Sequence, residues 1–318
     1  MEAAQYTRRI GGLGGALRLA LLNLVLRLSS WRMFGLVPDV ARLREKQLRT
    51  DARLARPAPD ISRTPIDCDG VPAEWIEVPG GAPRRVILYL HGGAFLFRYP
   101  HTHAKLVGGW CRSLGARALK VDYRLAPEHP FPAAPDDCHA AYCWLLAQGY
   151  AASDIVLAGD SAGGNLVLAT LHRIKAAGQA MPACAVVLSP FADCTLSGAS
   201  ILSNAASDPI FSLTDMMVIR RLYVRPECFL DPSASPLFGD FTGMPPLLVQ
   251  VGSTEMLRDD GVRVAARAHA AGVEVALEIW DKMPHVFQAI DLLPQAAAAN
   301  ARVVAFIAAR TSWRPETP

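Results

Sequence analysis

One serine lies in a setting that would make it a nucleophile. Ser161 is the centre of the segment Gly159-Asp160-Ser161-Ala162-Gly163-Gly164, which has the pattern G-x-S-x-G. An apolar, strand-like run (Ile155–Ala158) comes before this segment, and a helix-like run begins near Asn165. Flanking glycines allow the sharp strand-to-helix turn that exposes a nucleophilic hydroxyl. The segment lacks the G-K-[S/T] and G-x-G-x-x-G patterns of phosphate-binding loops, so the sequence predicts that Ser161 attacks a carbonyl carbon.

A histidine late in the chain is the predicted general base. In hydrolases with this serine turn, the partners follow in the order serine, acid, histidine. Only His269 and His285 lie in the last part of the chain, and His269 is inside an Ala-rich helical run that suits a surface or packing role. His285 follows a predicted strand that ends near Trp280, where a loop would face the serine. We therefore predict His285 as the base.

The acid is predicted in the loop after the strand Leu247–Val251. This loop offers Glu255, Asp259 and Asp260. Glu255 comes first after the strand, whereas the two aspartates have the position of helix N-terminal residues that favour the helix dipole. Glu255 is the predicted acid, and Asp259 remains the alternative.

A second glycine-containing loop could supply an oxyanion hole. The segment His91-Gly92-Gly93-Ala94-Phe95 follows a predicted strand that ends at Leu90. Small residues let backbone N–H groups approach a ligand closely, and such groups stabilise the oxyanion of an acyl-transfer intermediate. The predicted donors are the N–H groups of Gly92, Gly93, Ala94 and Ala162.

Neither a metal nor a cofactor is indicated. His101, His103 and His129 lie near one another in the sequence, but no carboxylate or cysteine completes a ligand spacing. The seven cysteines are scattered and include no C-x-x-C pair, so we expect reduced thiols in a cytoplasmic protein without a disulfide framework. The chemistry should need only side chains and backbone amides.

The elements that must position these residues alternate between strand and helix. Near-continuous apolar strands with crossover helices between them are typical of a mostly parallel sheet that is buried on both faces. The sequence therefore predicts an α/β fold. The predicted strands are 85–90, 116–123, 155–158, 185–188, 247–251 and 275–279, and the predicted helices are 135–147, 165–177 and 260–271.

Two segments depart from this alternation and are predicted to form a helical cap. Residues 1–56 form an N-terminal helical segment that a proline-rich connector joins to the catalytic domain, residues 57–318. Residues 189–245 are too long for a structureless loop and are expected to be an insertion over the sheet with one helix, Thr214–Tyr223.

The N-terminal segment contains an apolar run and a basic run. Residues 10–28 are apolar but are interrupted by Arg18 and Arg27. The residues that recur at helical spacing are Leu13, Leu17, Ala20, Leu21, Leu24, Val25 and Leu28. We expect an amphipathic helix that packs on the protein, with contact to a membrane surface as the alternative. Residues 42–56 are rich in arginine and are expected to form a solvated helix face.

Composition limits the partners. The 318 residues carry a net charge of +3, and 19% of them are charged, which is too balanced for a nucleic-acid-binding surface. A hydrophobic content of 51% is ample for one large core. A small-molecule substrate is the expected partner, and the sequence leaves a homodimer open.

The motifs together resemble the hormone-sensitive-lipase-like, or family IV, bacterial esterases. The resemblance runs from about Val86 to Phe287 and includes HGGAF, the segment DYRLAPEHPFPAA (residues 122–134), GDSAGG and the late histidine. It implies the α/β-hydrolase fold, a cap over the site, and structural support from residues 122–134. The chain departs from the family where Ala94 replaces a third glycine and where Glu255 replaces an aspartate in a D-P-L-x-D pattern that here is E-M-L-R-D.

The predicted activity is hydrolysis of carboxylic esters with short to medium acyl chains through a Ser-His-Glu triad. A lactone or amide hydrolase with the same triad is the alternative. A ligand-binding module on the same fold is disfavoured because the base is present. The chain-length prediction depends on an enclosed apolar pocket that would be lined by Trp31, Met33, Phe34, Ile210, Phe211, Met216 and Met217.

Overall fold

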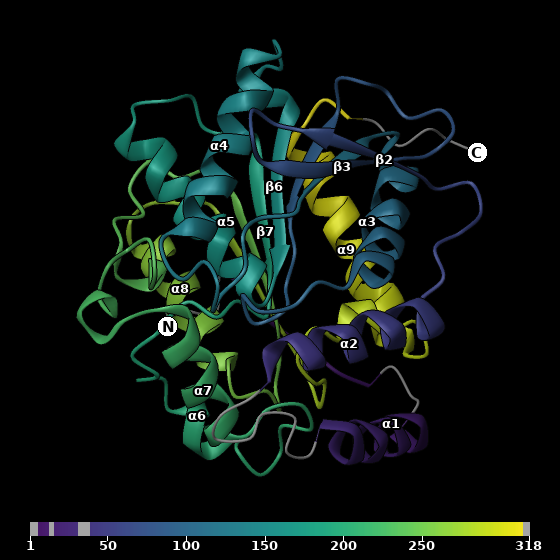
Figure 1. The fold of residues 1–318 in the computed structure, drawn as a ribbon, viewed down its shortest axis with the longest axis vertical. Coiled ribbons are helices and arrows are strands. Elements are labelled where there is room, and N and C mark those ends of the chain that lie inside the picture. The colour runs from purple at the N-terminus through teal and green to yellow at the C-terminus, as the bar shows by residue number, and fades with distance from the viewer. Residues whose placement is uncertain (1–5, 13–15, 31–38, 314–318) are drawn as a thin grey trace.

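A central sheet organises the molecule. The computed structural model describes residues 6–12, 16–30 and 39–313 (Figure 1). Within these residues the sheet has nine strands in the order β1-β9-β8-β7-β6-β4-β5-β3-β2. The strands are β1 (Thr7–Ile10), β2 (Ser62–Asp67), β3 (Pro72–Glu77), β4 (Val86–Leu90), β5 (Arg117–Val121), β6 (Ile155–Asp160), β7 (Cys184–Leu188), β8 (Leu247–Gly252) and β9 (Val275–Trp280).

The middle of the sheet is parallel and fully covered. Every residue of β4, β6, β7 and β8 is buried, which is the reason that these strands are apolar along their whole length. All six predicted strands are present within one or two residues of their expected ends. The predicted α/β fold with a mostly parallel sheet is therefore confirmed.

The edges of the sheet were not predicted. β2 and β3 form an antiparallel pair at one edge, and β1 adds a parallel strand beside β9 at the other edge. The expectation that residues 1–56 are wholly a helical cap segment is wrong for residues 7–10, because they belong to the main sheet. Four residues followed by two glycines were too short a pattern to separate from the apolar run beyond them.

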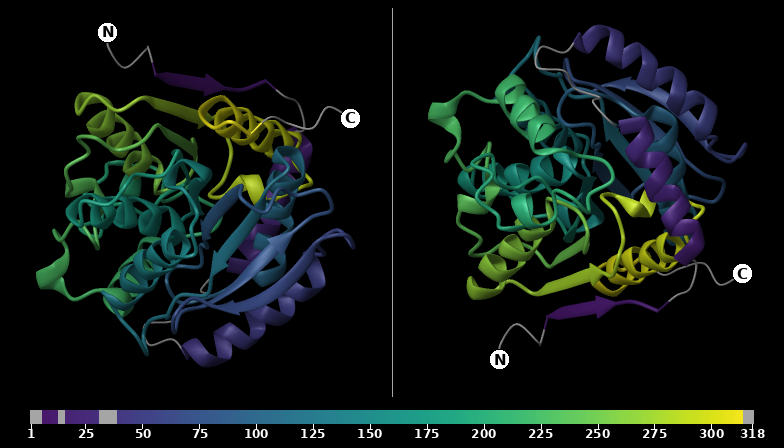
Figure 2. Two further views of the ribbon diagram at one scale, coloured as in Figure 1. Left: turned by 90° about the horizontal axis from the view of Figure 1, so that it is seen from above. Right: turned by 90° about the horizontal axis from the view of Figure 1, so that it is seen from below.

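Helices cover both faces of the sheet (Figures 1 and 2). α3 and α9 share one hydrophobic core with one face, and α4, α5 and α8 share another core with the opposite face. The helices have these bounds: α1 (Ala16–Ser30), α2 (Val40–Leu54), α3 (Pro100–Leu114), α4 (Ala133–Ala147), α5 (Ala162–Ala176), α6 (Ser200–Ser203), α7 (Leu213–Tyr223), α8 (Arg258–Ala270) and α9 (Pro294–Arg310).

The helices α1, α2, α6 and α7 gather at one end of the molecule, toward which β6 and β7 point (Figure 1). The predicted insertion helix is α7, and the short α6 was not foreseen. α2 is fixed to the body by Asp51, whose carboxylate accepts hydrogen bonds from the N–H groups of His101 and Thr102 at the start of α3. Arg44 of α2 also donates to the carbonyl oxygen of Leu96.

α1 packs on the protein with a different face from the one that the sequence suggested. Leu19 is buried in a cluster with Trp280, Met283 and Phe287, and Leu22 packs against the same cluster. Of the residues expected to pack, Leu13 lies outside the described residues, and the large apolar ones that are described are exposed instead: Leu17, Leu21, Leu24, Val25 and Leu28. None of the helices in the described residues is long and apolar enough to cross a membrane.

Candidate active site

Ser161 lies in the sharp turn between β6 and α5. Its backbone has φ 55° and ψ −118°, a conformation that costs free energy for a residue other than glycine. The turn is tight because Gly163 packs against the end of β4, where a Cβ atom would collide with the carbonyl oxygen of Leu90. This is the strained elbow that directs a serine hydroxyl toward the carboxyl end of the sheet.

The register of the sheet brings three predicted loops to that same end. In β8 and β9, Gly252 is opposite Trp280, so the loops that follow these strands are adjacent. Leu90 of β4 is opposite Gly159 of β6, so the glycine-containing loop starts beside the serine turn. Residues far apart in sequence therefore meet because their strands are parallel neighbours.

Ser161, His285 and Glu255 form one chain of hydrogen bonds. The Nε2 atom of His285 lies 2.8 Å from the Oγ atom of Ser161, and its Nδ1 atom lies 2.5 Å from Oε2 of Glu255. Glu255 is fully buried, and Ser161 and His285 are only 7% and 5% exposed. The structure thus brings together the predicted nucleophile, base and acid in the order that proton transfer requires.

The charge of Glu255 favours the protonated form of His285. Burial alone would lower the pKa of His285, because a buried imidazolium loses its hydration. The hydrogen bond and the negative charge of Glu255 outweigh burial, so the pKa of His285 is raised above its ordinary value of 6.5. The site can therefore stabilise an imidazolium that forms during a reaction.

The alternative acid, Asp259, has other partners. One oxygen of Asp259 accepts a hydrogen bond from the N–H of Ser200, and the other pairs with Arg258. Asp260 accepts from the N–H groups of Ala192 and Asp193. Among the three acidic side chains of this loop, Glu255 is the one that contacts His285.

The glycine-containing loop offers unpaired N–H groups beside the serine turn. Within the described part of the chain, the N–H groups of Gly93, Ala94 and Ala162 have no acceptor. The loop is strongly bent, with a positive φ at Gly93 and Ala94 (127° and 57°). A Cβ atom at Gly93 would collide with the carbonyl oxygen of Phe97, whereas Ala94 adopts the left-handed conformation despite its side chain.

The prediction that Gly92 is an oxyanion donor is wrong. Its N–H group donates to Oδ1 of Asp160 at 2.9 Å, so it is not available to a substrate. Asp160 also accepts from the hydroxyl of Tyr89 and lies 3.2 Å from Nε2 of His103. Burial would raise the pKa of Asp160, but His103 and these hydrogen bonds lower it to about 2. The buried carboxylate thereby fixes the loop next to the nucleophile.

The segment 122–134 supports the same loop from behind. The hydroxyl of Tyr123 donates to the carbonyl oxygen of His91 at 2.7 Å, and the two rings stack. The N–H of Ala126 donates to the carbonyl oxygen of Phe95. These contacts agree with the supporting role that the family resemblance implies.

Two residues that the sequence did not single out contact the acid and its loop. The hydroxyl of Ser189, at the end of β7, donates to Oε1 of Glu255 at 3.0 Å and accepts from the N–H of Val286. Asp208, in the insertion, accepts from the N–H of Met256 at 2.8 Å. The family pattern has proline at the position of Met256, and proline has no N–H to donate, so this bond depends on the departure from the pattern.

Asp208 also fixes an aromatic ring against the base. Its other oxygen accepts from the N–H groups of Ile210 and Phe211. The ring of Phe211 makes an edge contact with the imidazole of His285, with 5.1 Å between the ring centroids. Burial raises the pKa of Asp208 above its ordinary value. A lone aspartate in a long insertion carries no sequence signal that would have identified it.

The residues expected to line the acyl pocket are only partly described. Trp31, Met33 and Phe34 lie outside the described residues. Met216 is buried in the core, Met217 is 43% exposed, and Phe211 lies at His285. In the described residues, no three or more histidine, cysteine, aspartate or glutamate side chains form a group that could hold a metal ion.

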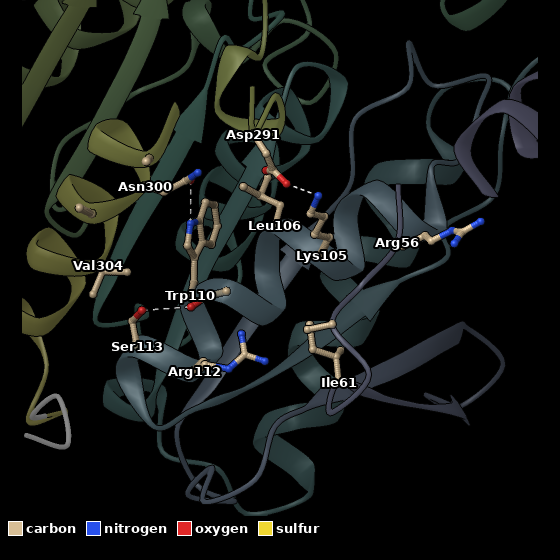
Figure 3. Close-up of a pocket in the computed structure, with 14 residues that line it drawn as sticks. Arg56, Ile61, Lys105, Leu106, Trp110, Arg112, Ser113, Asp291, Asn300 and Val304 are labelled. Atoms are coloured by element: carbon tan, nitrogen blue, oxygen red, sulfur yellow. Dashed lines mark hydrogen bonds and ion pairs between the residues drawn. The ribbon is translucent and has the colours of Figure 1, made fainter. Parts of the chain in front are cut away.

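One cavity lies away from this site. It has a volume of about 600 Å³ and is lined mainly by α3 and α9, including Trp110, whose Nε1 donates to the side chain of Asn300 (Figure 3). Of its three basic residues, Lys105 and Arg112 are paired with Asp291 and Asp60, and the third is Arg56. None of the predicted site residues lines it.

Comparisons with known proteins identify the fold family and the class of relatives. Residues 87–289 match a protein family whose description is alpha/beta hydrolase fold. An acetyl-hydrolase of Streptomyces hygroscopicus is 41% identical over 215 residues, which are 68% of this chain and 72% of the relative. An esterase of Acinetobacter venetianus is 35% identical over 90% of this chain and 93% of its own length.

A solved structure is similar over almost the whole chain. It is the crystal structure of an esterase from the bacterial hormone-sensitive lipase family, and it is 40% identical in sequence with a TM-score of 0.87. The match covers 94% of this chain and 99% of that chain.

Proposed function

Because the chain belongs to the hormone-sensitive-lipase-like esterases of the α/β-hydrolase family, we propose that it hydrolyses carboxylic esters through Ser161, His285 and Glu255. The observation that carries the proposal is the continuous set of hydrogen bonds from Glu255 through His285 to Ser161. The N–H groups of Gly93, Ala94 and Ala162, which have no acceptor in the described residues, support the proposal as donors to an oxyanion.

The proposed reaction has two steps. His285 removes the proton from Ser161 as the hydroxyl oxygen attacks the ester carbonyl, and the resulting imidazolium is stabilised by Glu255. His285 then gives the proton to the alcohol oxygen as the ester bond breaks, leaving an acyl-serine. A water molecule, deprotonated by His285, then attacks the acyl carbon. As the bond between that carbon and Oγ of Ser161 breaks, His285 returns the proton to Oγ and the carboxylic acid is released. The N–H groups of Gly93, Ala94 and Ala162 hold the oxyanion in both steps.

Ser189 and Asp208 are proposed as positioning residues. Ser189 binds both the acid and the loop that carries the base, so it fixes their separation. Asp208 binds the acid loop through Met256 and holds Phe211 against the imidazole. Both would act through Glu255 or His285, since their hydrogen bonds are to Glu255 or to the segments that hold these two residues.

The proposed substrates have short to medium acyl chains. Phe211 brings an aromatic side chain of the insertion against His285, which supports an enclosed and apolar approach to the serine. The relative from Streptomyces hygroscopicus is named an acetyl-hydrolase, which agrees with a small acyl group. In this proposal, residues of the N-terminal segment and of the insertion 189–245 form the cap. The seven unpaired cysteines support a cytoplasmic location.

A series of p-nitrophenyl esters tests the substrate class. We expect turnover to be highest with acyl chains of two to about eight carbons and to fall steeply at sixteen carbons, because a closed pocket excludes long chains. A parallel panel of lactones and anilides distinguishes esters from the alternative substrates. Faster hydrolysis of long-chain triglyceride emulsions than of the short esters would contradict the proposed pocket, and absence of all ester turnover would contradict the activity.

A further inference from the structure

The outer face of α1 is apolar and exposed. Two sets of apolar residues follow helical spacing on this helix. One set, with Leu19 and Leu22, packs against the body. The other set, which we call the leucine stripe, is 53–84% exposed, and none of the described residues buries it; its members are Leu17, Leu21, Leu24, Val25 and Leu28.

Single exposed leucines are common on protein surfaces, but a contiguous stripe is not. The members of the leucine stripe are spaced four, three, one and three residues apart, which puts them on one side of the helix. Exposing five large apolar side chains together is unfavourable in water. The stripe is therefore a surface of α1 that the described part of the chain leaves without an apolar partner.

Basic residues border the leucine stripe on α1. Arg18 and Arg27 lie at the two borders between the stripe and the packed face, and α1 contains no acidic residue. Arg27 is held in place, since it donates to the carbonyl oxygens of Ala206 and Ser207. On the neighbouring helix α2, Arg42 and Lys46 are exposed.

The whole N-terminal segment has the opposite charge from the rest of the protein. Residues 1–56 contain eleven lysines and arginines against four acidic residues, whereas the complete chain contains 32 against 29. Residues 57–318 therefore have 21 basic and 25 acidic residues. The net charge is +7 for residues 1–56 and −4 for residues 57–318. The small overall charge conceals this asymmetry.

We propose that the leucine stripe of α1 docks on the surface of an anionic phospholipid membrane. An apolar helix face bordered by arginines lies in the plane of a lipid interface, with its leucines among the acyl chains and its arginines at the headgroups. Basic residues near the helix add attraction to anionic lipid. The 15 residues of α1 span about 22 Å, which is too short to cross a bilayer.

Docking in this way would turn the active-site end of the molecule toward the lipid. α1 lies on the outside of the end toward which β6 and β7 point (Figures 1 and 2). Leu19 packs in one cluster with Met283 and Phe287, on either side of His285, and Arg27 holds the insertion next to Asp208. The proposal itself does not depend on the catalytic assignment, because binding is measured without turnover.

A second copy of the chain is the main competing occupant of the leucine stripe. Two apolar stripes packed together would bring the bordering arginines of both copies close to one another, which like charges oppose. Anionic headgroups neutralise these arginines instead. The charge of the segment therefore favours lipid over self-association.

Vesicle flotation tests the proposal. The full chain is mixed with vesicles of phosphatidylcholine alone or with about one third phosphatidylglycerol, at about 0.1 M and 1 M salt. We expect it to float with the anionic vesicles at low salt and to bind at least tenfold more weakly to the neutral vesicles. High salt should weaken binding severalfold, since it screens the arginines.

Matched variants locate the contact. Leu21→Gln combined with Leu28→Gln should weaken binding to anionic vesicles at least tenfold, because two large side chains no longer enter the lipid. Leu230→Gln combined with Leu292→Gln removes two leucines of similar exposure elsewhere (66% and 73%) and should leave binding unchanged. Arg18→Gln should weaken binding to anionic vesicles severalfold and leave the neutral ones unaffected.

Three outcomes would overturn the proposal. In the first, the wild-type chain stays unbound with every vesicle composition. In the second, both double variants bind like the wild type. In the third, light scattering shows a wild-type dimer that the Leu21→Gln/Leu28→Gln variant converts to a monomer, with no vesicle binding by either protein. Turnover of p-nitrophenyl butyrate and the circular dichroism spectrum verify that each variant is folded.

Discussion

The loops that carry the proposed triad and helix α1 differ in their exposure to solvent. Glu255 is fully buried, and its two oxygens have hydrogen-bond partners in Ser189, Gly252 and His285. α1 is attached by a few apolar contacts and by Arg27, and it leaves its leucine stripe exposed. In the loop of Glu255, buried polar groups have hydrogen-bond partners inside the protein, whereas α1 exposes apolar side chains to solvent.

The difference separates the proposed reaction from the proposed binding to a membrane surface. A triad must hold its atoms to within a few tenths of an ångström, so burial and hydrogen bonding suit it. A surface that contacts lipid needs exposed apolar area and positive charge but no exact partner. Changes in the first region should therefore alter the rate constant of the reaction, and changes in the second should alter only where the protein binds.

The largest effect is expected from Ser161→Ala. Without the hydroxyl no acyl-enzyme forms, so kcat for p-nitrophenyl butyrate should fall by about 10⁵-fold or more while the protein stays folded. Steady-state kinetics and the thermal unfolding midpoint provide the two readouts. Turnover that remains above a few per cent of the wild-type rate would show that another residue is the nucleophile.

Glu255→Gln should have the next largest effect. The variant keeps the shape of the side chain but loses the charge that stabilises the imidazolium, so kcat should fall by about 10²-fold to 10⁴-fold. Glu255 raises the pKa of His285, and the reaction needs the neutral imidazole, so wild-type activity falls as the pH drops through that raised pKa. Removing the charge should move this acidic limb of the kcat/KM profile to lower pH.

Asp259→Asn provides the control for the acid. Its carboxylate contacts Ser200 and Arg258 rather than His285, so the activity should change far less than in Glu255→Gln and the acidic limb should stay in place. A nearly wild-type Glu255→Gln together with an inactive Asp259→Asn would identify Asp259 as the acid instead.

Asp208→Asn is expected to reduce kcat about tenfold. The substitution weakens the bonds to Met256 and Phe211, so the acid loop and the ring against His285 lose their fixed positions. Asp208 also raises the pKa of His285, so the acidic limb should move slightly to lower pH. The control is Asp260→Asn, which alters another buried carboxylate that contacts neither Glu255 nor His285. If both variants lose kcat equally and the acidic limb of the kcat/KM profile stays in place, the role of Asp208 is merely structural.

The smallest effect on turnover is expected from the leucine stripe. Leu21→Gln combined with Leu28→Gln should hydrolyse dissolved p-nitrophenyl butyrate within about twofold of the wild-type rate, because these side chains contact no site residue. A tenfold loss of kcat at unchanged stability would mean that α1 takes part in the reaction, and the contrast between the two regions would fail.

The sequence was informative where burial leaves a pattern. β6 and β8 are buried along their whole length, so they were visible as continuous apolar runs. β2 is mostly exposed and contains polar residues at most positions, so no such run marked it. In α1 two apolar faces were present, and spacing alone did not tell which one packs, because that depends on the surface formed by Trp280 and Phe287.

For the site, too, the sequence was informative only where a residue has a recognisable local setting. Ser161, His285 and Glu255, which the structure joins by hydrogen bonds, could be selected from the sequence because each follows a recognisable strand, and chain order then restricts the choice. The N–H of Gly92 was assigned to the oxyanion hole because no sequence pattern shows that Asp160 binds it. Asp208 is brought to Met256 by the folding of a long insertion, a tertiary contact that no local motif predicts.

The most direct test of the central claim is peptide mass spectrometry after reaction with an excess of a serine-directed organophosphonate. The reagent forms a stable bond only with a serine activated by its base. We expect one adduct per chain, on the peptide that contains Ser161, and loss of esterase activity in proportion to labelling. Complete inactivation with the adduct on a different residue, or full esterase activity after Ser161 is fully labelled, would contradict it.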